Sequence, residues 1–210
     1  MPDTRLVRLG LLGPSEGDIV GLGRAAEYLL ASGKVSRVVY LGMDGALDKA
    51  VAAWARKLVG DDPSDDASWK RAAGIAASGS PAEIDNFVGV ERARMRLKLL
   101  EALPPGGRTI EMVGDRVAVL IHDKALLDEE DILAANLLVY GKSDTPLVKK
   151  IGSRWFVSPG QIGSDGGGIG ILDDEEADII ATFQDASGKT SMREALTVQR
   201  ATKVRIQGGA

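Results

Sequence analysis

Residues 137–185, LLVYGKSDTPLVKKIGSRWFVSPGQIGSDGGGIGILDDEEADIIATFQD, decide the fold of the chain. Short apolar runs alternate here with turns that contain glycine, proline or acidic residues, which is the pattern of successive β-strands. The expected strands are Leu137–Tyr140, Leu147–Ile151, Arg154–Val157, Gly168–Leu172 and Ala177–Gln184, preceded by Thr109–Met112 and Val117–Ile121 and followed by a terminal strand within Thr197–Ala210. The carboxyl-terminal third is therefore predicted to be mainly β.

The amino-terminal third has a different pattern, in which strands alternate with helices. The apolar run Leu6–Leu12 ends in Gly13-Pro14 and predicts a buried strand, and Val38–Leu41 predicts a second one. Between them, apolar residues recur at helical spacing from Asp18, which can cap the helix, to Gly33, which stops it. A strand, a helix and a strand with short connections predict a parallel pair with a right-handed crossover. A further helix is expected over Ala46–Leu58.

The middle of the chain is predicted to be helical. Residues 61–66 are acidic and contain a proline, which predicts a surface loop, and Trp69–Ala77 is expected to be a helix. Ser80, Pro81 and Glu83 form a capping box that predicts a long helix over Pro81–Leu103. Its predicted apolar side contains Val88, Met95, Leu99 and Leu103, and its predicted basic surface contains Arg92, Arg94, Arg96 and Lys98. That surface either meets an acidic partner or is simply solvated, with the arginine stems packed down.

Composition excludes several classes of protein. With 210 residues, of which 44% are apolar and 27% charged, the chain is long enough for one buried core. A net charge of -4 argues against broad nucleic-acid binding, and the absence of cysteine excludes disulfides and thiolate chemistry. Because His122 is the only histidine, mechanisms that need several imidazoles are excluded too. No apolar run is long enough for a signal peptide or a membrane span, so we expect a cytoplasmic protein.

Two motifs within residues 137–185 point to a known family. Gly141-Lys142-Ser143-Asp144 follows a predicted strand, and Ser158-Pro159-Gly160-Gln161 follows the next predicted hairpin. In order and separation they match the Gly-His-Thr-His loop and the Asn-Pro-Gly-Ser turn of small bacterial and archaeal phosphodiesterases. The segment therefore resembles the carboxyl half of the calcineurin-like metallophosphoesterases.

The amino-terminal part of the chain agrees with this resemblance. Leu9–Gly17, LGLLGPSEG, resembles the family's first strand with its Ser-Asp-x-His-Gly loop, and Val38–Met43, VVYLGM, resembles the second strand ending in Gly-Asp. Val117–Asp123, VAVLIHD, resembles the strand that ends in His-Gly. The implied fold is an α/β, two-sheet β-sandwich flanked by helices in α-β-β-α layers, as a single domain over residues 1–210. Residues from about 60 to 105 form a divergent helical segment, in which we find no counterpart of the family's Gly-Asn-His-Asp loop.

The resemblance also implies a site for two divalent cations, whose ligands can be carried over one by one. The first-loop aspartate becomes Pro14, the histidine two positions later becomes Glu16, and the bridging aspartate becomes Met43. The paired histidines become Lys142 and Asp144, which leaves His122 as the recognisable ligand. Proline offers no donor atom and a thioether is a poor ligand for hard cations, so no metal or other cofactor is expected. The remnant of the cleft consists of Pro14, Glu16, Met43, Asp44, His122, Asp123, Lys142 and Asp144.

Lys142 suggests that the ammonium of a lysine has replaced the positive charge of the lost cations. Its ammonium is expected to stand in for the cations by pairing with whichever of Glu16, Asp44, Asp123 and Asp144 lies nearest, with Glu16 as a possible partner; the alternative is a set of unrelated surface charges. A second possibility is one Mn or Mg site formed by Glu16, Asp44, Asp144 and His122. His122 and Asp123 form either an acid/base pair or a structural pair.

These substitutions favour a catalytically degenerate protein that acts as a protein interaction or scaffolding module. Its expected partner is another protein, which would meet Arg92 and Arg96 on the long helix or one of the adjacent aromatics Trp155 and Phe156. An apolar layer covering both faces of that strand is the alternative for the aromatics. Two other functions stay open: a metal-dependent phosphodiesterase or phosphatase with atypical ligands, and a sensor that binds phosphate or a nucleotide through Lys142.

Overall fold

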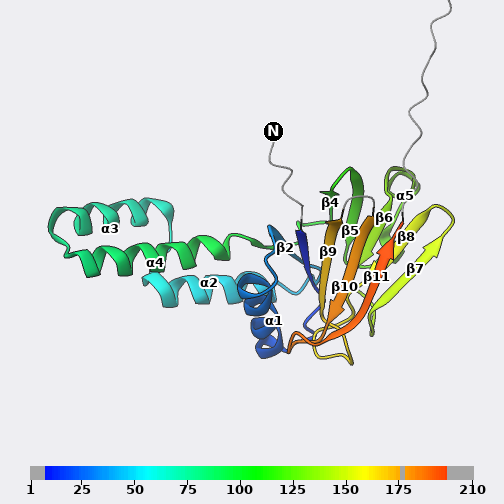
Figure 1. Ribbon diagram of the computed structural model, residues 1–210, viewed down its shortest axis with the longest axis horizontal. Helices are drawn as coiled ribbons and strands as arrows, with labels where there is room; N and C mark the ends of the chain where they lie inside the picture. Colours follow the sequence, from blue (N-terminus) through cyan, green and yellow to red (C-terminus); the bar gives the residue numbers. More distant parts are fainter. Residues whose placement is uncertain (1–7, 176–177, 198–210) are drawn as a thin grey trace, which may run out of the picture.

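Two β-sheets face each other in the computed structural model, which describes residues 8–175 and 178–197 (Figure 1). The first sheet has the strand order β11-β10-β9-β1-β2-β3, and the second has the order β4-β5-β6-β8-β7. The strands of the first sheet are β1 (Arg8–Leu12), β2 (Arg37–Tyr40), β3 (Leu100–Ala102), β9 (Ile169–Glu175), β10 (Asp178–Gln184) and β11 (Thr190–Leu196). Those of the second are β4 (Arg108–Val113), β5 (Arg116–Ile121), β6 (Leu137–Tyr140), β7 (Leu147–Ile151) and β8 (Arg154–Ser158).

The helices lie outside the two sheets. They are α1 (Ile19–Ala31), α2 (Ala46–Val59), α3 (Asp65–Ser78), α4 (Pro81–Leu97), the 3-10 turn η1 (Lys124–Leu126) and α5 (Glu129–Ala134). The α1 helix begins where the sequence predicts it, because the Asp18 carboxylate accepts a hydrogen bond of 2.8 Å from the amide of Gly21. It forms the predicted crossover, and β1 and β2 are parallel with Leu11 opposite Val39.

Successive side chains along a strand point to opposite faces of the sheet, so each sheet has apolar residues on both of its faces. Leu11, Val39 and Leu120 face the space between the sheets, where they form the central core together with Phe183. The outer face of the first sheet packs against α1, α2 and α4, and a smaller cluster around Leu138 lies between the second sheet and α5. This is the expected α/β sandwich with α-β-β-α layers.

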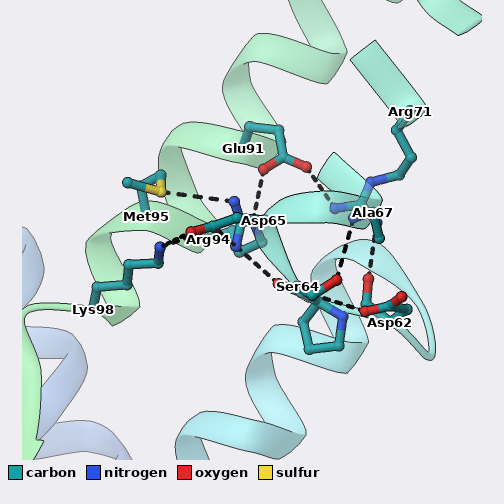
Figure 2. A network of polar contacts seen from close by, with 10 residues as sticks. Asp62, Ser64, Asp65, Ala67, Arg71, Glu91, Arg94, Met95 and Lys98 are labelled. Atoms are coloured by element: carbon teal, nitrogen blue, oxygen red, sulfur yellow. Dashed lines mark hydrogen bonds and ion pairs between the residues drawn. The ribbon is translucent and has the colours of Figure 1, made fainter. Parts of the chain in front are cut away.

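The helices α3 and α4, which we call the helical arm (Asp65–Leu97), project away from the sandwich in Figure 1. No residue of α3 is buried, and α4 buries only Arg94 and Leu97. The guanidinium of Arg94 lies 2.6 Å from Glu91 and 3.0 Å from Asp65, as Figure 2 shows. Arg71 contacts Glu91 at 2.9 Å, and Lys98 contacts Asp65 at 2.8 Å. Ion pairs rather than an apolar core therefore join α3 to α4.

Several details of the helical segment differ from the prediction. The helix expected to reach Leu103 ends at Leu97, and Leu100–Ala102 forms β3, which pairs in parallel with β2. Asp65 and Asp66, predicted to lie in a loop, form the first turn of α3, because Ser64 caps that helix by accepting from the amide of Ala67.

The exposed and buried faces of α4 also differ from the prediction. Val88 and Met95, assigned to the apolar side, are exposed, whereas Arg94, assigned to the basic surface, is only 6% exposed. The contacts with Glu91 and Asp65 explain this exchange, because a guanidinium can be buried once its donors are paired.

Two elements of the structure were not predicted, and one predicted strand cannot be compared with it. β11 and α5 were not expected, whereas the predicted terminal strand within Thr197–Ala210 lies, apart from Thr197 itself, outside the described residues. Within residues 8–175 and 178–197, no helix is both long and apolar enough to cross a bilayer.

Candidate functional site

The loops that follow β1, β2, β5, β6 and β8 meet at one edge of the sandwich, and we call them the strand-end cluster (residues 13–18, 41–45, 122–123, 141–144 and 158–160). Their backbones touch. A Cβ placed on Gly13 would lie 1.8 Å from the carbonyl oxygen of Gly160, and one placed on Gly141 would lie 2.5 Å from that of Leu41. Both glycines are therefore required by packing, since any side chain would push the two sheets apart at this edge.

A network around Tyr40 connects the first two of these loops. The amide of Ser15 donates to the Tyr40 hydroxyl at 3.0 Å, and that hydroxyl lies 3.0 Å from one carboxylate oxygen of Asp44. The Ser15 hydroxyl donates to the other oxygen at 3.1 Å, and the amide of Ala46 donates to Asp44 at 3.0 Å, at the start of α2. Both Ser15 and Tyr40 are buried, so the network lies at the base of the cluster.

The network changes the acidity of both titratable groups in it. Burial raises the pKa of the Tyr40 hydroxyl to about 12, so this hydroxyl stays protonated and can donate to the carboxylate. Burial acts to raise the pKa of Asp44 as well, but the hydrogen bonds from Ala46, Tyr40 and Ser15 outweigh it and hold that pKa below its ordinary value. Asp44 is therefore a carboxylate whose oxygens are already bound by protein donors.

His122 connects the two sheets at the same edge. Its Nδ1 lies 2.8 Å from the carbonyl oxygen of Leu41, and because a carbonyl only accepts, Nδ1 carries the proton. Its backbone amide donates to Gly107 at 2.9 Å, and its carbonyl accepts from the amide of Lys142 at 2.8 Å. These contacts assign His122 a structural position, with Nε2 as the ring nitrogen left to act as an acceptor.

Lys142 pairs with Asp123, one of the four carboxylates considered as its partner. The ammonium lies 2.7 Å from Oδ2, and the other oxygen of Asp123 accepts from the amide of Ala125 at 2.9 Å, which caps η1. The hydrogen bond to Asp123 raises the pKa of Lys142, and the same bond lowers the pKa of Asp123. Within the described part of the chain, Glu16 and Asp144 form no ion pair, so the Lys142–Glu16 pair suggested by the sequence is not formed.

Pro14, Glu16 and Met43 occupy the remaining positions implied for metal ligands. Pro14 is buried, and its carbonyl accepts from the amide of Ile162 at 2.9 Å. Glu16 is exposed and has a φ of 47°, and Gly17 after it has a φ of 90°. Met43 is exposed and extends toward Gly107, where its sulfur would lie 3.4 Å from an added Cβ.

These residues do not fit a pair of divalent cations. Across residues 8–175 and 178–197, no three histidine, aspartate or glutamate side chains come together as a metal site, and the set Glu16, Asp44, Asp144 and His122 is not assembled. Where the resemblance implies carboxylates and imidazoles, the cluster has a proline, a thioether and an ammonium. No reaction step through a metal can be derived from this donor set.

The residues predicted for partner binding are divided between surface and core. Arg92 and Arg96 are exposed on α4. Trp155 is only 8% exposed, because it faces the core between the sheets and its Nε1 donates to the carbonyl of Thr197 at 3.2 Å. Phe156 faces the opposite side and packs in the cluster beneath α5. Trp155 is thus buried in the core, as in the alternative considered from sequence, whereas Phe156 is only partly buried.

Ser15, in the strand-end cluster, and Tyr40, at the end of β2 just before it, are the residues of the network that the sequence did not predict. Both lie in segments that carry the resemblance, Leu9–Gly17 and Val38–Met43, but at positions for which the resemblance implies no ligand. The signal that could have found Tyr40 is its place at the end of a buried strand, because a buried tyrosine hydroxyl needs a hydrogen-bond partner.

Known structures with the same fold were found, although no family model and no curated protein matches the chain. A predicted phosphoesterase from Streptococcus pneumoniae is 14% identical over 91% of this chain and 99% of its own, with a TM-score of 0.52. YfcE, a phosphoesterase from E. coli, is 15% identical over 91% and 100%, with a TM-score of 0.53. Vacuolar protein sorting 29 from Cryptosporidium parvum is 12% identical over 90% and 97%, with a TM-score of 0.50. At these identities the likeness concerns the fold alone.

Proposed function

Because the chain has the calcineurin-like metallophosphoesterase fold, we propose that it is a catalytically degenerate form of that fold, acting as a protein interaction or scaffolding module in the cytoplasm. The observation that carries the proposal is the strand-end cluster. Its Lys142–Asp123 ion pair and its Tyr40–Ser15–Asp44 network use protein groups where the fold's enzymes would need metal ligands.

Electrostatics supports this proposal. A divalent cation near Asp123 would have to displace the ammonium of Lys142, which lies at 2.7 Å, and would be repelled by it otherwise. A cation near Asp44 would have to compete with the donors from Tyr40, Ser15 and Ala46. The framework is nevertheless kept, since the same loops remain in backbone contact through Gly13 and Gly141.

The proposal is tested by calorimetric titration with MnCl2 and by turnover of bis-p-nitrophenyl phosphate in Mn-containing buffer. We expect neither binding at millimolar Mn nor turnover above a buffer blank. Turnover that is lost in both His122→Ala and Asp144→Ala would instead establish a phosphodiesterase with atypical ligands. Lys149→Glu, an exposed position on β7, is the matched control.

The remaining possibility is a sensor that binds phosphate or a nucleotide through Lys142. A thermal-shift measurement with inorganic phosphate and a panel of nucleotides tests it. Since the ammonium of Lys142 is already paired with Asp123, we expect no change in melting temperature. A shift that depends on ligand concentration and disappears in Lys142→Ala would replace the scaffolding proposal.

A further inference from the structure

Residues of α1, α2 and α4 line a groove of about 820 Å³. Figure 1 shows that these three helices lie on the same side of the first sheet. Apolar side chains line it without being covered: Val20 is 65% exposed, Ile19 49% and Leu58 37%. Exposed apolar residues are ordinary when scattered, but here they gather along one concave surface. The groove is therefore a candidate docking surface that the strand-end cluster does not include.

Gly23 contributes no side chain to the apolar floor of this groove. It lies in the middle of α1, where glycine is less favourable than alanine, and its backbone needs no positive φ. A Cβ at Gly23 would meet the ring of Trp54 at 3.4 Å, an ordinary contact distance. Packing would therefore accept a side chain, and the effect of having none is that the Trp54 indole stays open to the groove.

The charges around the groove identify the chemistry of an occupant. Arg24, Lys57 and Arg96 line it, against the single carboxylate of Glu27. Within the described residues none of these three cations forms an ion pair or a side-chain hydrogen bond. Elsewhere on α4, by contrast, Arg94 is paired with carboxylates. An excess of unpaired cations in a chain of net charge -4 is complementary to an acidic partner.

We propose that this groove binds an amphipathic helix of a partner protein, whose apolar stripe lies against Val20, Trp54 and Leu58 and whose flanking carboxylates meet Arg24, Lys57 and Arg96. Three helices enclosing an apolar floor suit the helix-in-groove mode of recognition, with anchors at positions i, i+3 or i+4, and i+7. The inference rests on the proposed function and names the partner class of that module.

A second copy of the chain fits the groove less well. One acidic helix that the chain itself could offer is α3, but its Asp65 is already paired with Arg94 and Lys98. Another is α5, which has Glu129, Glu130 and Asp131 in its first turn and an exposed Leu133. It has only six residues, and Asp131 is already paired with Arg108 at 2.7 Å. A longer helix from another protein is therefore the occupant that the groove favours.

Fluorescence anisotropy tests the inference with the full chain and a labelled synthetic peptide. The probe is a helical peptide with leucine at positions i, i+3, i+4 and i+7 and glutamate on both flanks, and its matched control carries lysine in place of each glutamate. We expect saturable micromolar binding of the glutamate peptide and at least about tenfold weaker binding of the lysine peptide, since each close charge pair contributes on that order.

Two changes in the protein locate the binding. The combined charge reversal Arg24→Glu, Lys57→Glu and Arg96→Glu is expected to abolish binding of the glutamate peptide and to improve binding of the lysine peptide. Gly23→Met, which fills the floor with a residue that favours helices, is expected to weaken both without lowering the melting temperature. Lys149→Glu, an exposed lysine on β7, is the matched control and should bind as the unchanged chain does.

The outcomes separate this inference from the function on which it rests. Equal binding of the two peptides, no binding of either, or binding unaffected by both groove variants would overturn the inference, yet leave the metal and turnover results for the proposed function standing. A mass that rises with concentration in light scattering and returns to that of one chain in Gly23→Met would instead assign the groove to a second copy. Turnover with Mn would overturn the proposed function whatever the peptides do.

Discussion

Between the two sheets, Leu11, Leu120 and Phe183 are fully buried, whereas in the helical arm α3 buries no residue and α4 buries only Arg94 and Leu97. The sandwich is thus stabilised by apolar burial, at about 25 cal/mol for each Å² removed from water. The arm depends on ion pairs, of which exposed examples contribute only about 0–1 kcal/mol each. The sandwich and the helical arm therefore differ in how much free energy stabilises each and in how strongly salt weakens that stabilisation.

The largest expected effect belongs to the sandwich. Phe183→Ala removes a fully buried ring from the core between the sheets, and we expect the free energy of unfolding to fall by about 3–5 kcal/mol. Urea unfolding followed by far-UV circular dichroism measures the change. A loss below about 1 kcal/mol would mean that the sandwich does not depend on this core.

The second effect should be confined to the arm. Arg94→Met leaves Glu91 and Asp65 without their shared cation, and we expect opening of the arm to become easier by about 1–3 kcal/mol. Native-state hydrogen exchange should show loss of protection in α3 while the amides of β5 keep theirs. Arg92→Met, an exposed arginine on the same helix, is the control and should change neither. Equal loss in both regions would contradict the division drawn above.

Acid should weaken the arm before the sandwich. Burial acts to raise the pKa of Glu91, but hydrogen bonds from Arg94 and Arg71 outweigh it and lower that pKa from 4.5. Since the folded pKa is the lower one, the stabilisation is fully present above pH 4.5 and is lost as the pH falls through the folded value. Amide NMR signals of α3 should therefore change at a higher pH than those of β5. Coincident changes would mean that the arm and sandwich open together.

The smallest effect on the free energy of unfolding is expected for a large aromatic residue that is mostly exposed to solvent. Trp69 on α3 is 76% exposed, so Trp69→Ala should change the free energy of unfolding by no more than about 0.5 kcal/mol. Thermal unfolding of the two chains side by side measures this. A loss as large as that of Phe183→Ala would show that the arm has an apolar contact comparable with the core.

The same contrast explains which parts of the fold the sequence predicts. β1, α1 and β2 follow directly from apolar spacing, because burial creates that spacing. β3 was missed because Leu100 and Leu103 also continue the helical spacing of α4, and three residues carry little strand pattern. β11 was missed because this strand is largely polar and exposed, so its pairing with β10 leaves no apolar alternation to read.

At the strand-end cluster, the motifs found the loops but not their interactions. Met43, His122 and Lys142 were identified from their positions after predicted strands, and these loops do meet in space. That Lys142 would choose Asp123 over Glu16 depends on where each backbone turns, and φ of 47° at Glu16 has no signature in one sequence. The burial of Arg94 rather than Met95 is equally a matter of tertiary contacts, since both lie on the same helix.

The pairing of Val38 with Leu100 has a consequence for the order in which the chain folds. β2 and β3 are neighbours in the sheet, but α2, α3 and α4 all lie between them in the sequence. Closing such a long connection costs little more than closing a shorter one, about 0.6 kcal/mol for each doubling of length, but contacts between distant residues form slowly. The hairpin of α3 and α4 is local and can form early, so we expect the β3 edge to be completed late, after the arm that delivers it.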